Sequence, residues 1–146
     1  MQDTLVGLFI EAFFSRTLWQ LTSEVRYFAM FEFGETDMLM PSLIAILGGT
    51  LAGFANSLVG RGLAIFQERG ELNLTEEKYE RAQLWGNRLV WLIGFLSWYW
   101  IGAIFLFAAG FLRVSHWKVI LATLTGQVVF YGYYYLLSTG QITSIF

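Results

Sequence analysis

The chain has 146 residues, of which 56% are hydrophobic and only 14% are charged, and its formal net charge is −2. A chain of this size with so few charges cannot cover its own core with polar surface in water, so we expect an integral membrane protein. The slight negative charge gives no reason to expect a nucleic-acid partner, and the absence of cysteine excludes disulfides and thiol chemistry. With a single histidine and no cysteine, neither a metal site nor a cofactor is expected.

The first apolar run, residues 5–21, is interrupted by Glu11 and Arg16, and Glu24 and Arg26 follow at once. Four ionisable groups are costly in contact with lipid but tolerated against protein or beside a wet cavity. We therefore expect residues 5–37 to form a re-entrant helical hairpin and a polar turn, with these four side chains as its polar centre. A structural ion pair between Glu11 and Arg16 is the simpler interpretation, and their five-residue spacing would require a bend in the helix.

Residues 38–60 form an uncharged run that is long enough to span a bilayer, which takes roughly 20 helical residues. Gly49 and Gly53 have the spacing that lets two helix backbones approach closely, and Gly60 extends this row of small residues. Packing within the subunit and a homodimer seam both fit this pattern. Asn56 is expected to bond to a neighbouring helix, and Arg61 with the glycine after it is predicted to end the span.

Residues 61–88 contain five basic and five acidic side chains and form the most polar segment of the chain. Asn73 followed three residues later by Glu76 is typical of a helix start, so a short polar helix is predicted over residues 75–88. Glu77 and Arg81 would then share one face. A solvated connector is the plain interpretation of this segment, and a docking surface for a partner is the alternative.

Residues 89–112 are again uncharged, but a single crossing would place basic residues on both sides of the membrane. Short loops rich in Lys and Arg tend to stay cytoplasmic, so we expect a second re-entrant hairpin that turns at residues 97–102. Both basic clusters, including Arg113 and Lys118, then share the cytoplasmic face with the connector 61–88. Residues 119–137 are predicted to form the second span. A broken apolar segment followed by an uninterrupted span thus occurs twice, which is typical of transporter architecture.

Three segments carry a resemblance to a known family. SEVRYFAMFEFG (residues 23–34), GGTLAGFANSLVGR (48–61) and AAGFLRVSHWKVILATLTGQ (108–127) resemble, in order and spacing, motifs of the YqaA-like branch of the DedA (VTT-domain) membrane proteins. The likeness extends over residues 8–135. It implies two re-entrant hairpins that face each other across a bacterial inner membrane, with spanning helices around them. It also implies movement of lipids, such as phospholipid scrambling or polyprenyl-phosphate recycling, with ties to the proton motive force.

The chain departs from the family at several positions. In the first hairpin, Gln20 and Leu21 stand where the family has Pro and Gly. In the second hairpin, Tyr99 and Ala103 stand where it has Pro and an acidic residue, and in the last helix Gln127 and Phe130 stand where it has a basic pair. Of the ionisable residues of the family, Glu24 is kept. Transport of a charged headgroup needs a basic group for phosphate and a titratable acid for protons. We therefore expect a non-catalytic structural or accessory subunit of a larger membrane assembly. A translocator of lipid or small solutes that uses the polar centre is the alternative, and an enzyme is not expected.

The aromatic residues near the second turn and in the last span suggest where partners bind. Aromatic side chains anchor helices at membrane interfaces and contact lipids and other subunits. The expected partners are membrane lipids and either other integral membrane subunits or further copies of the chain. The residues predicted to contact them are Trp98, Tyr99, Trp100, Tyr131 and Tyr134.

Overall fold

The computed structural model describes residues 2–18, 25–33, 37–70, 72 and 74–140, and every regular element in these ranges is a helix. The all-helical fold class predicted from the sequence is confirmed for this part of the chain. The helices are α1 (Gln2–Arg16), α2 (Val25–Phe33), α3 (Leu39–Glu68), α4 (Glu76–Phe95), the 3₁₀ helix η1 (Leu96–Trp98), α5 (Trp100–Phe111) and α6 (His116–Ser138).

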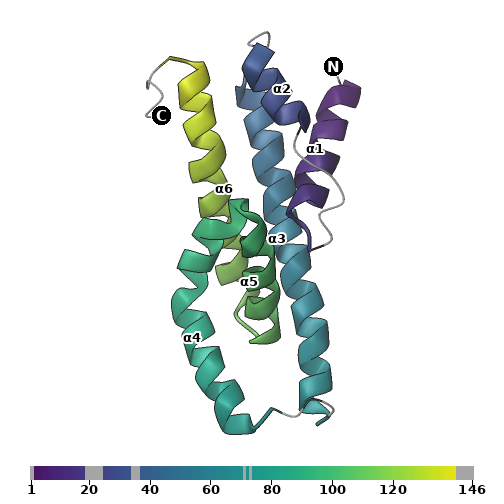
Figure 1. The fold of residues 1–146 in the computed structure, drawn as a ribbon, viewed down its shortest axis with the longest axis vertical. Helices are drawn as coiled ribbons and strands as arrows, with labels where there is room; N and C mark the ends of the chain where they lie inside the picture. Colours follow the sequence, from purple (N-terminus) through teal and green to yellow (C-terminus); the bar gives the residue numbers. More distant parts are fainter. Residues whose placement is uncertain (1, 19–24, 34–36, 71, 73, 141–146) are drawn as a thin grey trace.

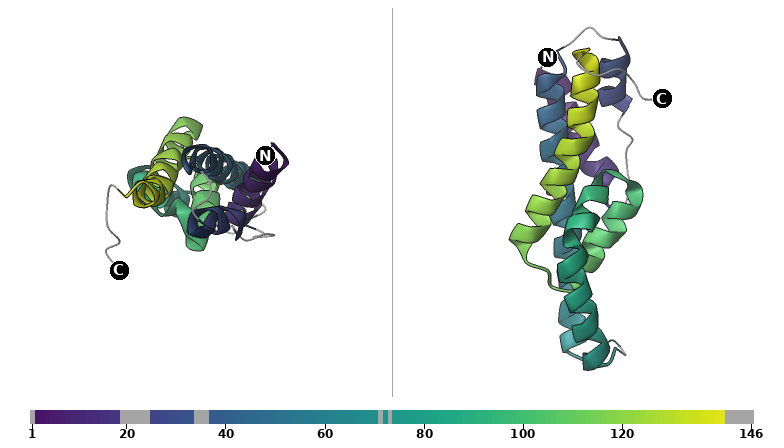
Figure 2. Two further views of the ribbon diagram at one scale, coloured as in Figure 1. Left: turned by 90° about the horizontal axis from the view of Figure 1, so that it is seen from above. Right: turned by 90° about the vertical axis from the view of Figure 1, so that its left-hand side faces the viewer.

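Two helices, α3 and α6, have the length and apolar composition needed to cross a membrane. They overlap the predicted spans 38–60 and 119–137. With 30 residues, α3 is about 45 Å long, which is more than the roughly 30 Å of a hydrocarbon core. Its last turns, together with the start of α4, extend beyond the loop that joins α5 to α6 (Figures 1 and 2).

Each half of the described chain consists of shorter helices followed by one long helix (Figure 1). In the first half, α1 and α2 lie beside the beginning of α3. In the second half, α4 rises from the opposite end of the molecule, the chain reverses at η1, and α5 runs back alongside α3 before α6 begins. The long helices α3 and α6 are neighbours and run in opposite directions (Figure 2).

Small residues allow the helix backbones to approach closely. A methyl group added to Gly110 of α5 would lie 1.9 Å from the carbonyl oxygen of Ser57, and one added to Gly60 of α3 would lie 1.9 Å from that of Phe107. Both distances are far below van der Waals contact, so only glycine fits at either position. The small residues of α3 therefore pack against a helix of the same chain.

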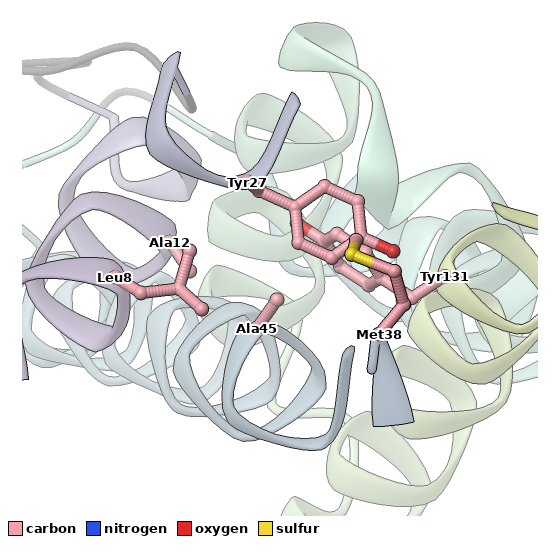
Figure 3. Packing of buried hydrophobic residues seen from close by; sticks show 6 residues of the cluster. All are labelled: Leu8, Ala12, Tyr27, Met38, Ala45 and Tyr131. Atoms are coloured by element: carbon pink, nitrogen blue, oxygen red, sulfur yellow. The ribbon is translucent and has the colours of Figure 1, made fainter. Parts of the chain in front are cut away.

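The buried apolar residues form two clusters. The first cluster joins α1, α2, α3 and α6, and its central contact is between the rings of Tyr27 and Tyr131, whose centroids are 4.8 Å apart (Figure 3). The second joins α4, α5 and α6 with the α5–α6 loop and consists of Val90, Leu106, Ala109, Val114, Val119 and Ala122. The outward faces of α3, α4 and α6 are also apolar, as shown by exposed Leu47, Leu92 and Val128.

The predicted end of α3 at Arg61 and Gly62 is wrong, because the helix continues to Glu68. The Arg61 guanidinium does not face its own helix end but donates to the carbonyl oxygen of Val114 in the α5–α6 loop. The helix ends at Glu68, just before Gly70, which has a φ of +73°, and the amide groups of Arg69 and Gly70 donate to the last carbonyls. A tertiary contact of the arginine thus replaces its expected capping role.

Two further boundaries differ from the prediction. The polar helix expected over residues 75–88 and the first arm of the second apolar segment are one helix, α4, which begins after Thr75. The Asn73 expected to cap it lies outside the described residues. Likewise α1 is continuous from Gln2 to Arg16, so the bend expected between Glu11 and Arg16 is absent. The predicted turn at residues 97–102 overlaps η1 and the extended residue Tyr99 that separates it from α5.

Candidate polar centre between the two halves

Asn56 of α3 holds the end of α1. Its amide nitrogen donates to the carbonyl oxygen of Arg16 at 2.9 Å, and its amide oxygen accepts from the backbone N–H of Leu18 at 3.1 Å. The Asn56 residue is 1% exposed. Helix ends leave backbone groups without intrahelical partners, and a buried end needs side chains to satisfy them. One amide therefore satisfies both a donor and an acceptor where α1 stops.

The side chain of Arg16 extends from the end of α1 to α6. Its guanidinium donates to the hydroxyl of Tyr131 at 3.3 Å and lies over the rings of Phe130 and Tyr131, 5.4 and 6.0 Å from their centroids. Cation–π contacts of this kind stabilise a guanidinium. Two aromatic rings of the second half therefore contact the charge of the half-buried Arg16.

Glu11 of α1 and Arg26 of α2 form a second polar contact. The Glu11 carboxylate accepts from the Arg26 guanidinium at 2.9 Å and from the Arg26 backbone N–H at 3.1 Å. The Glu11 side chain is 18% exposed and that of Arg26 is 49% exposed, so the pair reaches the surface. Of the four residues predicted to form the polar centre, the structure brings these two together, whereas Arg16 reaches the aromatic residues of α6. Glu24 lies outside the described residues.

A buried polar group in the second half was not predicted. Gln127 of α6 is completely buried, its amide nitrogen donates to the Ser97 hydroxyl at 3.2 Å, and that hydroxyl donates to the carbonyl oxygen of Thr123 at 3.4 Å. Among the described residues the amide oxygen of Gln127 has no hydrogen-bond partner. An amide in the middle of the apolar run 119–137 is the sequence signal for this group, and Ser97 at the break in the other run is its partner.

The glycine pair of α3 faces α6 rather than the outside. A methyl group on Gly49 would lie 2.6 Å from the amide oxygen of Gln127, and one on Gly53 would lie 2.6 Å from the Thr123 methyl carbon. Both glycines are buried. In the structure this row of small residues therefore packs within the subunit, and a homodimer seam there has no exposed surface.

The aromatic residues predicted to contact partners have different surroundings. Tyr131 is 0% exposed and packs on Tyr27, which leaves it no surface for a partner or lipid, so that prediction is corrected by its burial. Tyr134 is half-buried, and its ring contacts Phe28 and Phe31 of α2. Tyr99 is 48% exposed at the chain reversal. The side chains of the tryptophans at positions 98 and 100 lie outside what the structure describes.

The described residues contain no group of three or more His, Asp or Glu side chains that could hold a metal ion. The candidate polar centre consists of amide, hydroxyl, guanidinium and aromatic groups. Some of these groups link α1 to α3 and α6, and others link the chain reversal at η1 to α6. Comparison of the chain with models of protein families, with curated proteins and with solved structures finds no match.

Proposed function

We propose that the protein is a non-catalytic integral membrane protein with a DedA-like fold that serves as a structural subunit of a larger membrane assembly. Support for the membrane comes from α3 and α6, which are long and apolar enough to span it, and from the apolar outer surface. Leu47 and Leu51 of α3, Trp91 and Leu92 of α4 and Val129 of α6 are each more than 40% exposed. Such a surface is stable when lipid or other apolar helices cover it.

In this proposal α1 with α2, and α4 with α5, are re-entrant hairpins. With 15 and 12 residues, α1 and α5 have lengths of about 22 and 18 Å, which are too short to cross a hydrocarbon core of about 30 Å. Asn56 supplies partners to the backbone where α1 ends, as a helix end within the membrane requires.

The basic residues support a cytoplasmic position for the connector 61–88. Arg113 of the α5–α6 loop pairs with Glu68 at 2.8 Å, and Lys118 donates to Asn87 of α4 at 3.4 Å. The loop after α5 and the start of α6 therefore contact residues of the connector 61–88. Loops rich in Lys and Arg favour the cytoplasmic side, and we propose the inner membrane of a bacterium as the location.

The observation that carries the subunit proposal is the environment of Arg16. A headgroup-binding arginine must exchange its contacts during transport, whereas this guanidinium is held by a hydroxyl and two aromatic rings of α6. Its backbone carbonyl is also engaged, by Asn56. These contacts join the two halves of the chain and favour a fixed structural role over a moving one.

Purification of the tagged chain from its native membrane in a gentle detergent, followed by mass spectrometry, tests the proposal. We expect other integral membrane subunits in stoichiometric amounts. As a matched pair, Tyr99→Ala removes an exposed ring at the chain reversal and is expected to reduce recovery of these subunits, whereas Tyr133→Ala alters a half-buried ring against Tyr134 and is expected to reduce it less. Recovery of the wild-type chain alone would overturn the subunit proposal.

The second candidate is a translocator of lipid or small solutes driven by the proton motive force. The Glu11–Arg26 pair favours it, since a guanidinium that reaches the surface could exchange the Glu11 carboxylate for the anionic group of a substrate. Flux of a fluorescent phospholipid in reconstituted vesicles under a proton gradient tests this function. The translocator requires flux that Glu11→Gln abolishes and that Glu77→Gln, which alters an exposed pair on α4, leaves intact.

A further inference from the structure

An apolar groove runs along the outside of the second half, between α4 and α5. It has a volume of about 350 Å³ and is lined by apolar side chains, with Trp85, Leu89 and Leu92 on one wall and Phe105, Ala108 and Leu112 on the other. Trp85, Leu92 and Phe105 are 58%, 57% and 41% exposed, so the groove is accessible from outside the molecule. With no polar lining group, it suits a hydrocarbon and not a headgroup or a polar peptide.

The groove is longer than the hydrocarbon part of one leaflet and shorter than that of a whole bilayer. Along α4 and the first residue of η1 it extends from Ala82 to Leu96, and this distance corresponds to about 21 Å of helix. It stops where the chain reverses at η1. The hydrocarbon half of one leaflet is about 15 Å thick, whereas a spanning helix of a partner needs about 30 Å of apolar contact. The groove is therefore long enough for one lipid chain and too short for a spanning helix.

The charges at the outer end of the groove favour an anionic lipid. Lys78 precedes Ala82 and Trp85 by four and seven residues, so it lies on the same face of α4 as the groove, one turn beyond its end. Lys78 and Arg88 are exposed, and no described residue forms an ion pair with either. Two acidic residues of the same helix, Glu76 and Glu80, line a separate polar pocket with Glu68 and Gln67 of α3.

We propose that the α4–α5 groove holds one acyl chain of an anionic phospholipid from the cytoplasmic leaflet, with its phosphate beside Lys78. The inference rests on the membrane position in the proposed function but not on the subunit role. A lipid seated here would fill the space between the two helices of the second hairpin. It would thereby extend the apolar core formed by Val90, Leu106 and Ala109 out to the membrane.

Native mass spectrometry of the detergent-purified full chain tests the proposal, with equimolar dioleoyl phosphatidylglycerol and dioleoyl phosphatidylcholine as probes. We expect one phosphatidylglycerol per chain to be retained preferentially. Ala108→Phe fills the groove and should lower retention about tenfold, since several buried methylene groups lose their site. Ile104→Phe adds the same ring at a half-exposed position of α5 outside the groove and should have no effect. Equal retention by the two variants would overturn the proposal.

The headgroup contact has its own control. Lys78→Gln should lower the preference for phosphatidylglycerol over phosphatidylcholine about fivefold, as expected for one cation near the headgroups. Arg69→Gln removes an equal charge at the exposed end of α3 and should leave the preference unchanged. Equal retention of the two lipids by the wild-type chain would overturn the anionic assignment.

Photo-crosslinking in the membrane needs no groove-filling variant that could fail to fold. The chain has no cysteine, so Leu89→Cys can carry a single benzophenone in the groove. An adduct with phospholipid mass supports the proposal, and an adduct with another protein would overturn it in favour of a partner helix.

If subunits co-purify but phosphatidylglycerol is not retained, the groove inference fails and the proposed function stands. If the chain is missing from the membrane fraction, the proposed function fails.

Discussion

Replacement of Asn56 by alanine should detach the end of α1 from α3. The substitution removes a donor to the Arg16 carbonyl and an acceptor from the Leu18 N–H, bonds of 2.9 and 3.1 Å, and leaves both backbone groups without their partner in a site where Asn56 is 1% exposed. Hydrogen bonds of polar side chains between membrane helices contribute about 0.6 to 1.7 kcal/mol each. The two bonds together predict a loss of about 1–3 kcal/mol in the free energy of unfolding.

Asn87 provides a matched control. It is an exposed amide on α4 that donates to Gln83 at 3.2 Å and accepts from Lys118 at 3.4 Å. Because water can replace these partners, Asn87→Ala should change stability by no more than about 0.5 kcal/mol. The measurement is unfolding of both variants in mixed micelles by titration with a denaturing detergent, followed by circular dichroism.

A second measurement separates loss of the α1 contact from general destabilisation. Leu18→Cys introduces the single thiol of the chain at a half-buried position, and its rate of reaction with a maleimide reports access to the end of α1. We expect the rate to rise when Asn56→Ala is added under conditions where the chain remains folded. An unchanged rate, or a loss of stability no greater than that of Asn87→Ala, would refute the reasoning that Asn56 holds this helix end.

Three other predictions concern backbone packing, backbone conformation and orientation. Gly110→Ala should destabilise the fold by about 1–3 kcal/mol because the helices must separate, whereas Gly132→Ala, which meets nothing within 4 Å, should be neutral in the same micelle assay. At Arg113, where φ is +57°, the Arg113→Gly variant should be more stable than the Arg113→Ala variant by about 1 kcal/mol. Both variants lose the arginine side chain, but only glycine adopts a left-handed backbone without strain. Equal melting temperatures of the two variants would contradict this. A cysteine at Thr75 should react with an impermeant maleimide from the cytoplasmic side, and one at Asp37 from the opposite side; labelling of both from one side would contradict the proposed orientation.

Features with a local signal were the ones that the sequence could predict. The predicted span 119–137 lies within α6, because a long uncharged run leaves a helix as its stable conformation in an apolar setting. The reversal near residues 97–102 followed from the distribution of basic residues on either side of the run, and η1 falls there. The end of α3 was missed since Gly62 and Gly70 can both end a helix, and the choice depends on the contact of Arg61 with Val114, 53 positions away.

The candidate site shows the same division between local and long-range information. A polar residue in an apolar run indicated that Asn56 needs a partner, but that partner is a backbone segment around Arg16 and Leu18, which no side-chain pattern reveals. The expected pairing of Glu11 with Arg16 considered neighbours along one helix, whereas the structure pairs Glu11 with Arg26 of the next. Gln127 and Ser97 are 30 positions apart, so only the packing of η1 against α6 makes them partners.

The position of Arg16 gives the physical reason to prefer a structural role. Its carbonyl is bound by α3 of its own half, and its guanidinium by α6 of the other half. Movement of α1 relative to α3 would break the bond to the Arg16 carbonyl, and movement relative to α6 would break the contacts of its guanidinium, which is costly without replacement partners. A translocator would have to supply that partner as substrate at every cycle. A subunit needs no replacement, because its arginine remains between the two halves and holds them together.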